Sequence, residues 1–429
     1  MNKNQKLPLA IVADILGTSK KVVNSWSDKK LKATIDKKTG KKYFHLDELR
    51  SFPSASFLFE TKWGEEERIK PSRNYKIIEL FAGAGGLALG LEKAGFQSLL
   101  LNEIDRDACE TLKKNRVNWN VKNCDIREYD FTKFKGEVDL LTGGFPCQAF
   151  SYAGKKLGFN DTRGTLFYEF ARAVKETNPK VILAENVKGL VSHDSGKTLE
   201  TIKNIIHEIG YELVEPKILK AIFYKVPQKR ERIFLVAIRK DLSRFVSFNY
   251  PAKFPKIFTL RDALKKGDLF NKDVPKTEGQ IYPQRKKEIL SKVPQGGYWR
   301  DLPDDLQREY MRGSYFLGGG KTGLARRLSW DEPSLTLTCA PAQKQTERCH
   351  PTETRPLTFR EYARIQTFPD EWQFCGSLSS IYKQIGNAVP VNLAYAVGRS
   401  LVNLLNEIEN HEIQKTNLKE FNFDDLKAS

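Results

Sequence analysis

From about residue 76 to residue 240, short apolar runs of β-forming composition alternate with stretches of helical character. The candidate strands are KIIELF, SLLLNEID, VDLLTGGF, VILAENV and RIFLVAIR. Such alternation is typical of a parallel sheet covered by helices, because a connection between parallel strands needs a crossover that is usually a helix. This region is therefore predicted to be an α/β domain.

The charge of the chain points to a polyanionic partner. Lysine and arginine number 71 against 53 acidic residues, a formal net charge of +18 that is spread along the 429 residues. A basic chain suits nucleic acid, although a high charge can also serve solubility alone. The decision between these two interpretations rests on the motifs.

We expect neither a membrane segment nor a metal site. No stretch approaches the roughly 18 apolar residues that span a bilayer, and the first residues, MNKNQKLPLA, lack the apolar core of a signal peptide. The six cysteines form no CxxC pair, and Cys339, Cys349 and His350 match no common zinc spacing. A soluble intracellular protein with free thiols is expected.

Residues 7 to about 50 are predicted to form two helices followed by a β-hairpin. The second helix would carry Lys20, Lys21 and Asn24 outward, a helix-turn-helix spacing with basic residues on the recognition face. With a turn at 38–40 between two β-prone runs, the unit resembles the winged helix of excisionase-like and mercury-regulator-like DNA binders. Contact of these three residues with DNA is expected; the alternative is a basic docking domain.

A glycine-rich turn follows the first candidate strand. The segment FAGAGG leads into an amphipathic helix, and glycines there let the backbone approach a ligand closely. A nucleoside cofactor is indicated, although dinucleotide-binding and methyl-transferring enzymes share such turns. The second strand ends in LNEID, where an acid would bind the ribose hydroxyls of adenosine; Glu103 is the better candidate and Asp105 the alternative.

Cys147 is a candidate nucleophile. It stands in GGFPCQAFS after the strand VDLL, and the proline before it fixes the approach of the chain. A thiol with an ordinary pKa near 8.5 needs nearby positive charge or backbone donors to act as a thiolate at neutral pH.

Five motifs together resemble those of DNA cytosine C5-methyltransferases. They are FAGAGG, GGFPCQAFS, AENV at 184–187, QKRER at 228–232 and IGNAVP at 385–390, in the order of that family. The resemblance covers about 76–240 and 326–402, and one modest departure is Glu79, where many relatives have aspartate. It implies a Rossmann-like α/β methyltransferase domain with a small, mostly irregular or β target-recognition domain. The predicted N-terminal winged helix lies outside the resemblance.

The resemblance, the predicted N-terminal unit and the polar, highly charged stretch TKWGEEERIKPSRN after it divide the chain into segments. These are a winged helix-turn-helix at 1–60, a linker at 61–75, the catalytic domain at 76–240, the target-recognition domain at 241–354, and a C-terminal segment at 355–429 that returns to the catalytic domain from about 380.

The chemistry implied is nucleophilic catalysis. C5 of cytosine is too electron-poor to attack a methyl sulfonium until a nucleophile has added at C6, and Cys147 would be that nucleophile. Glu185 would donate a proton to N3, and Arg230 would meet the base edge while Gln228 and Arg232 brace the loop. The implied catalytic residues are Cys147, Glu185, Asn186, Arg230 and Arg232.

The remaining site residues follow from the same resemblance. S-adenosyl-L-methionine is implied as the cofactor, with the binding residues Phe81, Gly83, Gly85, Gly86, Leu87, Glu103, Ile104, Asp125, Ile126, Pro146, Asn387, Ala388 and Val389. Double-stranded DNA is implied as the substrate, contacted by Gln148, Ser151, Gln228 and Arg355 in addition to the N-terminal residues named above. The target base would rotate out of the duplex into the pocket.

The family further implies a bacterial, cytoplasmic enzyme of a restriction-modification system, monomeric and with a cognate restriction endonuclease encoded nearby. The stretch LTLTCAPAQKQTERCHPTETRP favours sites of the GGCC or GGNCC kind. The alternatives are an RNA cytosine methyltransferase and a DNA-binding transcriptional regulator. The loop of exocyclic-amino methyltransferases, Asp/Asn-Pro-Pro-aromatic, is absent from the sequence.

Overall fold

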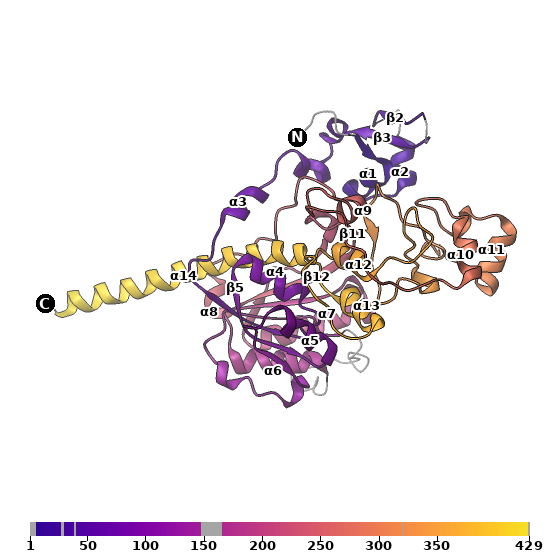
Figure 1. The fold of residues 1–429 in the computed structure, drawn as a ribbon. Helices are drawn as coiled ribbons and strands as arrows, with labels where there is room; N and C mark the ends of the chain where they lie inside the picture. Colours follow the sequence, from indigo (N-terminus) through magenta and orange to yellow (C-terminus); the bar gives the residue numbers. More distant parts are fainter. Residues whose placement is uncertain (1–5, 27–29, 38–39, 147–164, 320, 428–429) are drawn as a thin grey trace.

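The computed structural model describes residues 6–26, 30–37, 40–146, 165–319 and 321–427 (Figure 1). Three residues predicted for the site, Cys147, Gln148 and Ser151, lie outside this described part.

The centre of the fold is an eight-stranded sheet with the order β10-β12-β8-β7-β4-β5-β6, in which β9 also pairs with β12. Its strands are β4 (Tyr75–Leu80), β5 (Phe96–Glu103), β6 (Val121–Asn123), β7 (Leu140–Gly143), β8 (Val181–Val187), β9 (Tyr211–Leu213), β10 (Lys217–Lys220) and β12 (Glu231–Arg239). The five predicted strands are all present.

The sheet is mixed, and the prediction of a parallel sheet was wrong at one edge. The ladders from β6 to β8 are parallel. β12 runs antiparallel to β8, β9 and β10. Only a short connection separates β10 from β12, and a short connection can join antiparallel but not parallel strands.

Helices cover both faces of the sheet, and neighbouring residues of β4 show the division. Ile77 belongs to a core with α4 (Gly86–Ala94) and α14 (Val391–Lys427), whereas Ile78 belongs to a core with α6 (Leu166–Thr177) and α7 (Lys197–Glu208). This follows from the period of two in a strand. The edge near β6 is covered by α5 (Arg106–Asn115).

The last helix is a core element over much of its length. The region Leu378–Thr416 is long and apolar enough to cross a membrane by length and composition alone, but 83% of its most apolar window is buried inside the protein. The end of α14 extends away from the body (Figure 1).

The N-terminal unit, which we define as residues 6–58, contains two helices and a three-stranded sheet of order β1-β3-β2. Its elements are β1 (Lys6–Pro8), α1 (Leu9–Leu16), α2 (Lys20–Trp26), β2 (Ala33–Ile35), β3 (Lys42–His45) and two 3-10 helices, η1 (Leu46–Leu49) and η2 (Pro53–Leu58).

The segment predicted as a linker, 61–75, contains a helix, α3 (Trp63–Arg68). Trp63 is 3% exposed, and its ring packs edge-on against Phe254 and 4.0 Å from the guanidinium of Arg399. The polar composition of the segment gave no sign of this contact, because a single large aromatic side chain, Trp63, supplies much of the buried surface.

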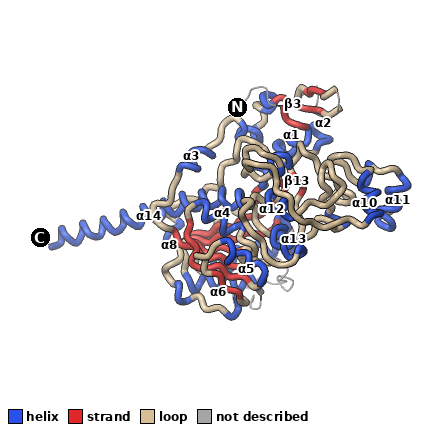
Figure 2. Tube along the Cα trace, viewed as in Figure 1, coloured by secondary structure: helices blue, strands red, loops and turns tan. Residues whose placement is uncertain are grey.

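The segment 241–354 is mostly loop, as predicted (Figure 2). Its regular elements are short helices and, within the residues that the structure describes, the one strand β13 (Ser334–Leu335), so the expected β character was wrong. The helices are α9 (Leu260–Leu264), α10 (Gln284–Ser291), α11 (Asp304–Met311) and the 3-10 helices η10 (Trp299–Asp301), η11 (Arg312–Tyr315) and η12 (Lys344–Thr346), after α8 (Lys240–Ser243). β13 pairs in parallel with β11 (Gln228–Lys229), which ties this segment to the catalytic domain.

The C-terminal segment returns to the catalytic domain before residue 380. The helices α12 (Phe359–Ile365) and α13 (Leu378–Asn387) share one apolar core with α4 and α5. Leu357 and Tyr362 are fully buried in that core, so the return begins near 357.

Candidate active site

A cavity of about 740 Å³ lies where the carboxyl ends of four strands meet. The chain leaves β4, β5, β7 and β8 at residues that line it, and open α/β sheets bind ligands at such ends. The lining residues are Glu79, Phe81, Ala82, Gly83, Gly86, Leu87, Glu103, Ile104, Asp105, Ala108, Gly144, Phe145, Pro146, Glu185, Asn186, Val187, Arg232, Lys383, Gln384, Asn387, Ala388 and Val389.

The glycine-rich turn brings backbone to the cavity wall. Phe81 has a φ of 58° and Gly83 a φ of 53°, and a Cβ at Gly83 would meet open space. A Cβ at Gly86 would lie 2.3 Å from the carbonyl oxygen of Val389. Glycine at position 86 therefore lets the segment 388–389 close against the turn.

Glu103 braces this turn from the end of β5. One carboxylate oxygen accepts a hydrogen bond from Gly83 N at 2.7 Å, and the other accepts from Asp105 N at 2.8 Å. Asp105 caps α5 and lies 3.0 Å from Lys383 Nζ. Although partial burial raises the pKa of Asp105, the bonds from Lys383 and the helix terminus hold it below its usual range.

A second acid, Glu79, lines the cavity and was not predicted as a site residue. Its side chain is 2% exposed, and burial together with Glu103 raises its pKa well above the ordinary value. The Oε2 atom has no hydrogen-bond partner among the described residues. The sequence did carry a signal for this residue, because Glu79 is a single carboxyl group within the apolar run KIIELF, near the end of a predicted strand.

The Glu185 carboxyl group lies at the end of β8 in an ion pair. Its Oε1 is 2.7 Å from Arg232 Nε, and the two side chains are only 11% and 13% exposed. Burial raises the pKa of Glu185, while the charges of Arg232 and Arg230 oppose that rise. A Cβ at Gly144 would lie 3.1 Å from the Oε2 of Glu185, so the chain leading to Cys147 passes directly beside this carboxyl.

Asn186 also contacts the chain segment that leads to Cys147. Its Nδ2 donates to the carbonyl of Phe145 at 2.8 Å, and its Oδ1 accepts from Val187 N at 2.8 Å. The amide thus links the end of β8 to the residue before Pro146.

The two arginines of the QKRER segment, Arg230 and Arg232, have different surroundings from each other. Arg232 lines the cavity beside Glu185, whereas Arg230 is 1% exposed and donates long hydrogen bonds to the carbonyls of Leu337 and Asn387, at 3.4 and 3.3 Å. Burial and the neighbouring Arg232 lower the pKa of Arg230 to about 9. Arg230 does not line the active-site cavity, and its predicted contact with a base edge stays a prediction.

Gln228 was predicted to contact DNA, and the structure contradicts this. Its side chain has 0% exposure, donates to Gln366 Oε1 at 2.8 Å and accepts from Leu337 N at 2.9 Å. An amide with no exposed surface cannot reach a duplex.

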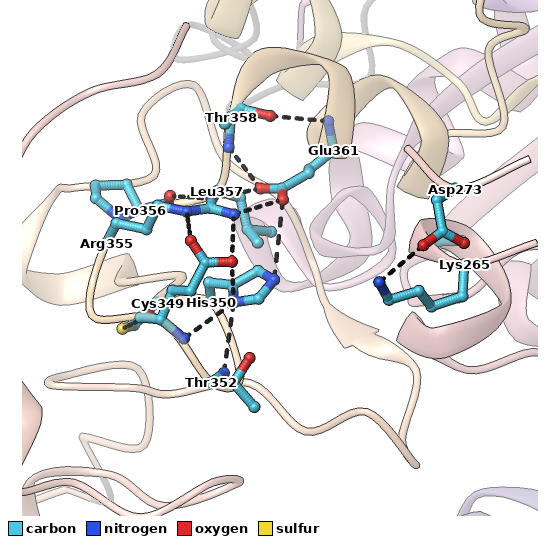
Figure 3. Close-up of polar contacts among 12 residues, drawn as sticks. Lys265, Asp273, Cys349, His350, Thr352, Arg355, Pro356, Leu357, Thr358 and Glu361 are labelled. Carbon is cyan, nitrogen blue, oxygen red and sulfur yellow. Dashed lines mark hydrogen bonds and ion pairs between the residues drawn. The ribbon is translucent and has the colours of Figure 1, made fainter. Parts of the chain in front are cut away.

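Arg355 lies at the start of α12. It donates two hydrogen bonds of 2.8 Å to Glu361 and also pairs with Glu353 (Figure 3). Glu361 in turn accepts from Thr358 N at 2.7 Å as part of the α12 capping box.

The remaining predicted residues lie in the cavity wall, elsewhere in the interior of the fold, or on its surface. All predicted cofactor residues line the cavity except Gly85, Asp125 and Ile126. Gly85 packs toward Leu112, Asp125 caps a short 3-10 helix, η3 (Ile126–Glu128), and Ile126 is buried. Lys20, Lys21 and Asn24 are exposed on α2, and Lys20 Nζ lies 2.9 Å from Glu332.

The chain matches the family described as C-5 cytosine-specific DNA methylase over residues 75–403. It belongs to this family. Type II methyltransferase M.Eco47II of Escherichia coli is 64% identical over 405 residues, which cover 94% of this chain and 97% of that protein. M.PspPI of Psychrobacter sp. (strain TA137) is 59% identical over 398 residues, 92% of this chain and 96% of that protein. M.Sau96I of Staphylococcus aureus is 52% identical over 342 residues, 79% and 78% of the two chains.

Among solved structures, a putative DNA modification methyltransferase of a prophage in Escherichia coli superposes with a TM-score of 0.55. It shares 25% identity, covering 78% of this chain and all of that one. The protein is therefore a C-5 cytosine-specific DNA methyltransferase of the Type II class, which uses S-adenosyl-L-methionine as methyl donor and acts on double-stranded DNA. The predicted family, enzyme class and methyl donor are confirmed, and the RNA alternative is not supported.

Proposed function

We propose that this methyltransferase attacks C6 of a flipped-out cytosine with Cys147 while Glu185 protonates N3. The observation that carries the proposal is the buried Glu185–Arg232 pair beside the chain segment that leads through Pro146 into Cys147. Addition of the thiolate at C6 moves electron density toward N3, and a proton donor there stabilises the adduct and makes C5 nucleophilic.

The residues around Glu185 support a proton donor. Burial favours the neutral, protonated carboxyl, and the contact of its Oε1 with Arg232 Nε at 2.7 Å fixes its orientation. Asn186 fixes Phe145, two residues before the proposed nucleophile. After methyl transfer, the C5 proton passes to water, the Cys147 thiolate leaves C6 as the C5–C6 double bond re-forms, and the N3 proton returns to Glu185, which restores the aromatic ring and the free enzyme.

The cavity fits S-adenosyl-L-methionine, and its volume lies within the range of about 300–1,000 Å³ typical of ligand pockets. We assign Phe81, Gly83, Glu103, Asn387 and Val389 to the binding of this cofactor, with Glu103 as the acceptor for ribose hydroxyls. The carboxyl group of Glu103 in the wall of the cavity suits a cationic ligand. When bound, the cofactor supplies the methyl group as an electrophilic carbon on a sulfonium.

We further propose that residues 241–354 select the target site, of the GGCC or GGNCC kind, and that the base rotates out of the duplex to reach the cavity. The similarity to three Type II methyltransferases supports a role in protecting host DNA from a cognate restriction endonuclease. We propose that the enzyme acts as a monomer in the bacterial cytoplasm.

The test is covalent trapping on duplex DNA that contains 5-fluorocytosine, with the cofactor present. The fluorine at C5 cannot leave as a proton does, so the thiolate adduct persists. We expect an adduct with the wild-type chain and none with Cys147→Ala, and mapping of the trapped base gives the target site. An adduct with Cys147→Ala would refute the assignment of the nucleophile.

A second candidate role concerns the N-terminal unit. The exposed Lys21 and Asn24 on α2, and the hairpin of β2 and β3 behind it, support a winged helix-turn-helix that binds DNA. We propose binding to the promoter of the enzyme's own operon. Gel-shift assays with that promoter should show weaker binding for Lys21→Glu; equal binding would refute this role.

A further inference from the structure

The N-terminal unit is fixed to the catalytic domain through a shared apolar core. Its buried side chains form one cluster with residues of the catalytic domain. Phe57 packs edge-on against Phe223 with ring centroids 5.2 Å apart, and just after the unit Thr61 Oγ1 donates to the carbonyl of Lys253 in the segment 241–354 at 2.6 Å. A unit attached by a continuous core cannot turn independently of the body without exposing that core.

An ionic cluster adds to this attachment at a functionally important strand. Asp14 of α1 lies 2.7 Å from Lys229 Nζ of β11, Lys229 lies 3.9 Å from Glu332, and Glu332 lies 2.9 Å from Lys20 of α2. The side chains of Asp14, Lys229 and Glu332 are only 21–24% exposed. Lys229 directly precedes Arg230, so the N-terminal unit contacts the strand that leads to Arg230 and Arg232.

A second cavity, of about 400 Å³, lies at this junction. It shares Val187 and Arg232 with the active-site cavity and is closed on one side by Asp14. Its lining residues include five cationic side chains, Lys188, Lys220, Lys229, Arg230 and Arg232, against two acidic ones, Asp14 and Glu231. An excess of cations at the surface of the fold suits an anionic group such as a phosphodiester.

We propose that the N-terminal unit binds the same duplex that the active site methylates, along the phosphate backbone on one flank of the target site. The inference rests on the proposed function, because it takes the cavity at Glu185 as the place of the target cytosine. The cationic lining of the 400 Å³ cavity would continue the path of the duplex from the active site toward α2. The exposed side chains of Lys21, Asn24, Lys30 and Lys32 are available along this path.

The competing arrangement is an independent head that holds a second duplex. The shared core and the ionic cluster argue against it, because both fix the unit beside the active site. The two arrangements differ in stoichiometry: one duplex per enzyme in the first, two in the second.

The first experiment measures affinity against the length of the duplex. Duplexes with the site mapped by trapping are extended on either flank from roughly 12 to 24 base pairs, about one to two helical turns. We expect tighter binding on extension of one flank. The variant Lys21→Glu/Lys32→Glu should lose most of this gain, and the slope of log K against log salt should fall by about 2, close to one unit for each lost phosphate contact.

A matched control is Lys114→Glu/Lys135→Glu. It changes the net charge equally, and both residues are exposed. Lys135 precedes β7 and Lys114 lies near the end of α5, so both lie toward the amino ends of the strands, opposite the active-site cavity. The control variant should keep the gain in affinity that extension of one flank gives the wild-type chain. A gain that persists in the Lys21/Lys32 variant, or no gain in the wild-type chain on either flank, would overturn the inference; thermal unfolding checks that each variant folds.

The second experiment uses the trapped enzyme. A covalent adduct on a long 5-fluorocytosine duplex should bind a second, labelled duplex at least tenfold more weakly than an adduct on a short duplex does, because only the long duplex occupies the N-terminal unit. Equal binding would refute the inference alone. Failure to form any adduct would refute the proposed function instead, so the two failures are distinguishable.

Discussion

Gly86→Ala should damage both stability and cofactor binding. The added Cβ would lie 2.3 Å from the carbonyl oxygen of Val389 and 3.1 Å from the Cβ of Ala388. Carbon and oxygen atoms approach no closer than about 3.3 Å even in weak hydrogen bonds, so the two segments must separate by about 1 Å. Both segments line the active-site cavity, and the strain therefore falls on the cofactor site.

The size of the effect follows from this displacement. Overpacking of this kind costs about 1–3 kcal/mol, and the gain in helix propensity from glycine to alanine at the first residue of α4 offsets less than about 1 kcal/mol. A misplacement of about 1 Å in a binding site can lower the rate about a hundredfold. We expect a small loss of stability and a fall of about a hundredfold in kcat/KM.

Thermal unfolding with and without S-adenosyl-L-methionine, isothermal titration with the cofactor, and initial rates on duplex DNA measure these effects. The matched control is Gly64→Ala in α3, where an added Cβ meets nothing within 4 Å and φ is not in the left-handed region. The control should retain wild-type stability and activity. If Gly86→Ala binds the cofactor as tightly as the wild-type chain and unfolds at the same temperature, the reasoning from the close approach is wrong.

Three further predictions concern single side chains. Glu185→Gln should lower kcat by about 10²–10⁴-fold in steady-state assays; since burial raises the pKa of Glu185, the wild-type kcat should fall as pH rises through that pKa, and the same fall in Glu185→Gln would contradict the role. Trp63→Ala should lower the free energy of unfolding in denaturant by about 3–5 kcal/mol, because the ring is buried; a change below about 1 kcal/mol would show that α3 is not an anchor. Lys383→Ala should change that free energy by no more than about 1 kcal/mol, since its pair with Asp105 is largely exposed, and a larger loss would contradict this view.

The sequence predicted the parallel part of the sheet and most of the cavity wall. Strands buried on both faces appear as continuous apolar runs, and the turn after β4 carries its own glycine signal. Most of the glycine-rich turn and residues 387–389 could be assigned to one cofactor site from the motifs of the family, and the structure brings Phe81, Gly83, Gly86 and Leu87 into one cavity with residues 387–389.

Features that depend on long-range packing could not be predicted. Gln228 and Arg230 are polar residues in a basic motif, and only the paths of the segments at 337, 366 and 387 decide that they face inward. The antiparallel edge of the sheet likewise depends on strand pairing that apolar runs do not encode. Trp63 stands in a charged segment, and its burial requires partners at 254 and 399.

The cofactor cavity joins segments from distant parts of the chain. Glu79 to Leu87 form one wall, and Asn387 to Val389, about three hundred residues later, form another. A ribosome making the chain at about 5–20 residues per second therefore completes the first wall at least fifteen seconds before the second. During synthesis the nascent chain has no closed cofactor site, so binding of S-adenosyl-L-methionine reports that both ends of the catalytic domain have assembled. The cofactor would then stabilise the assembled state in proportion to its concentration, by RT ln(1 + [L]/Kd).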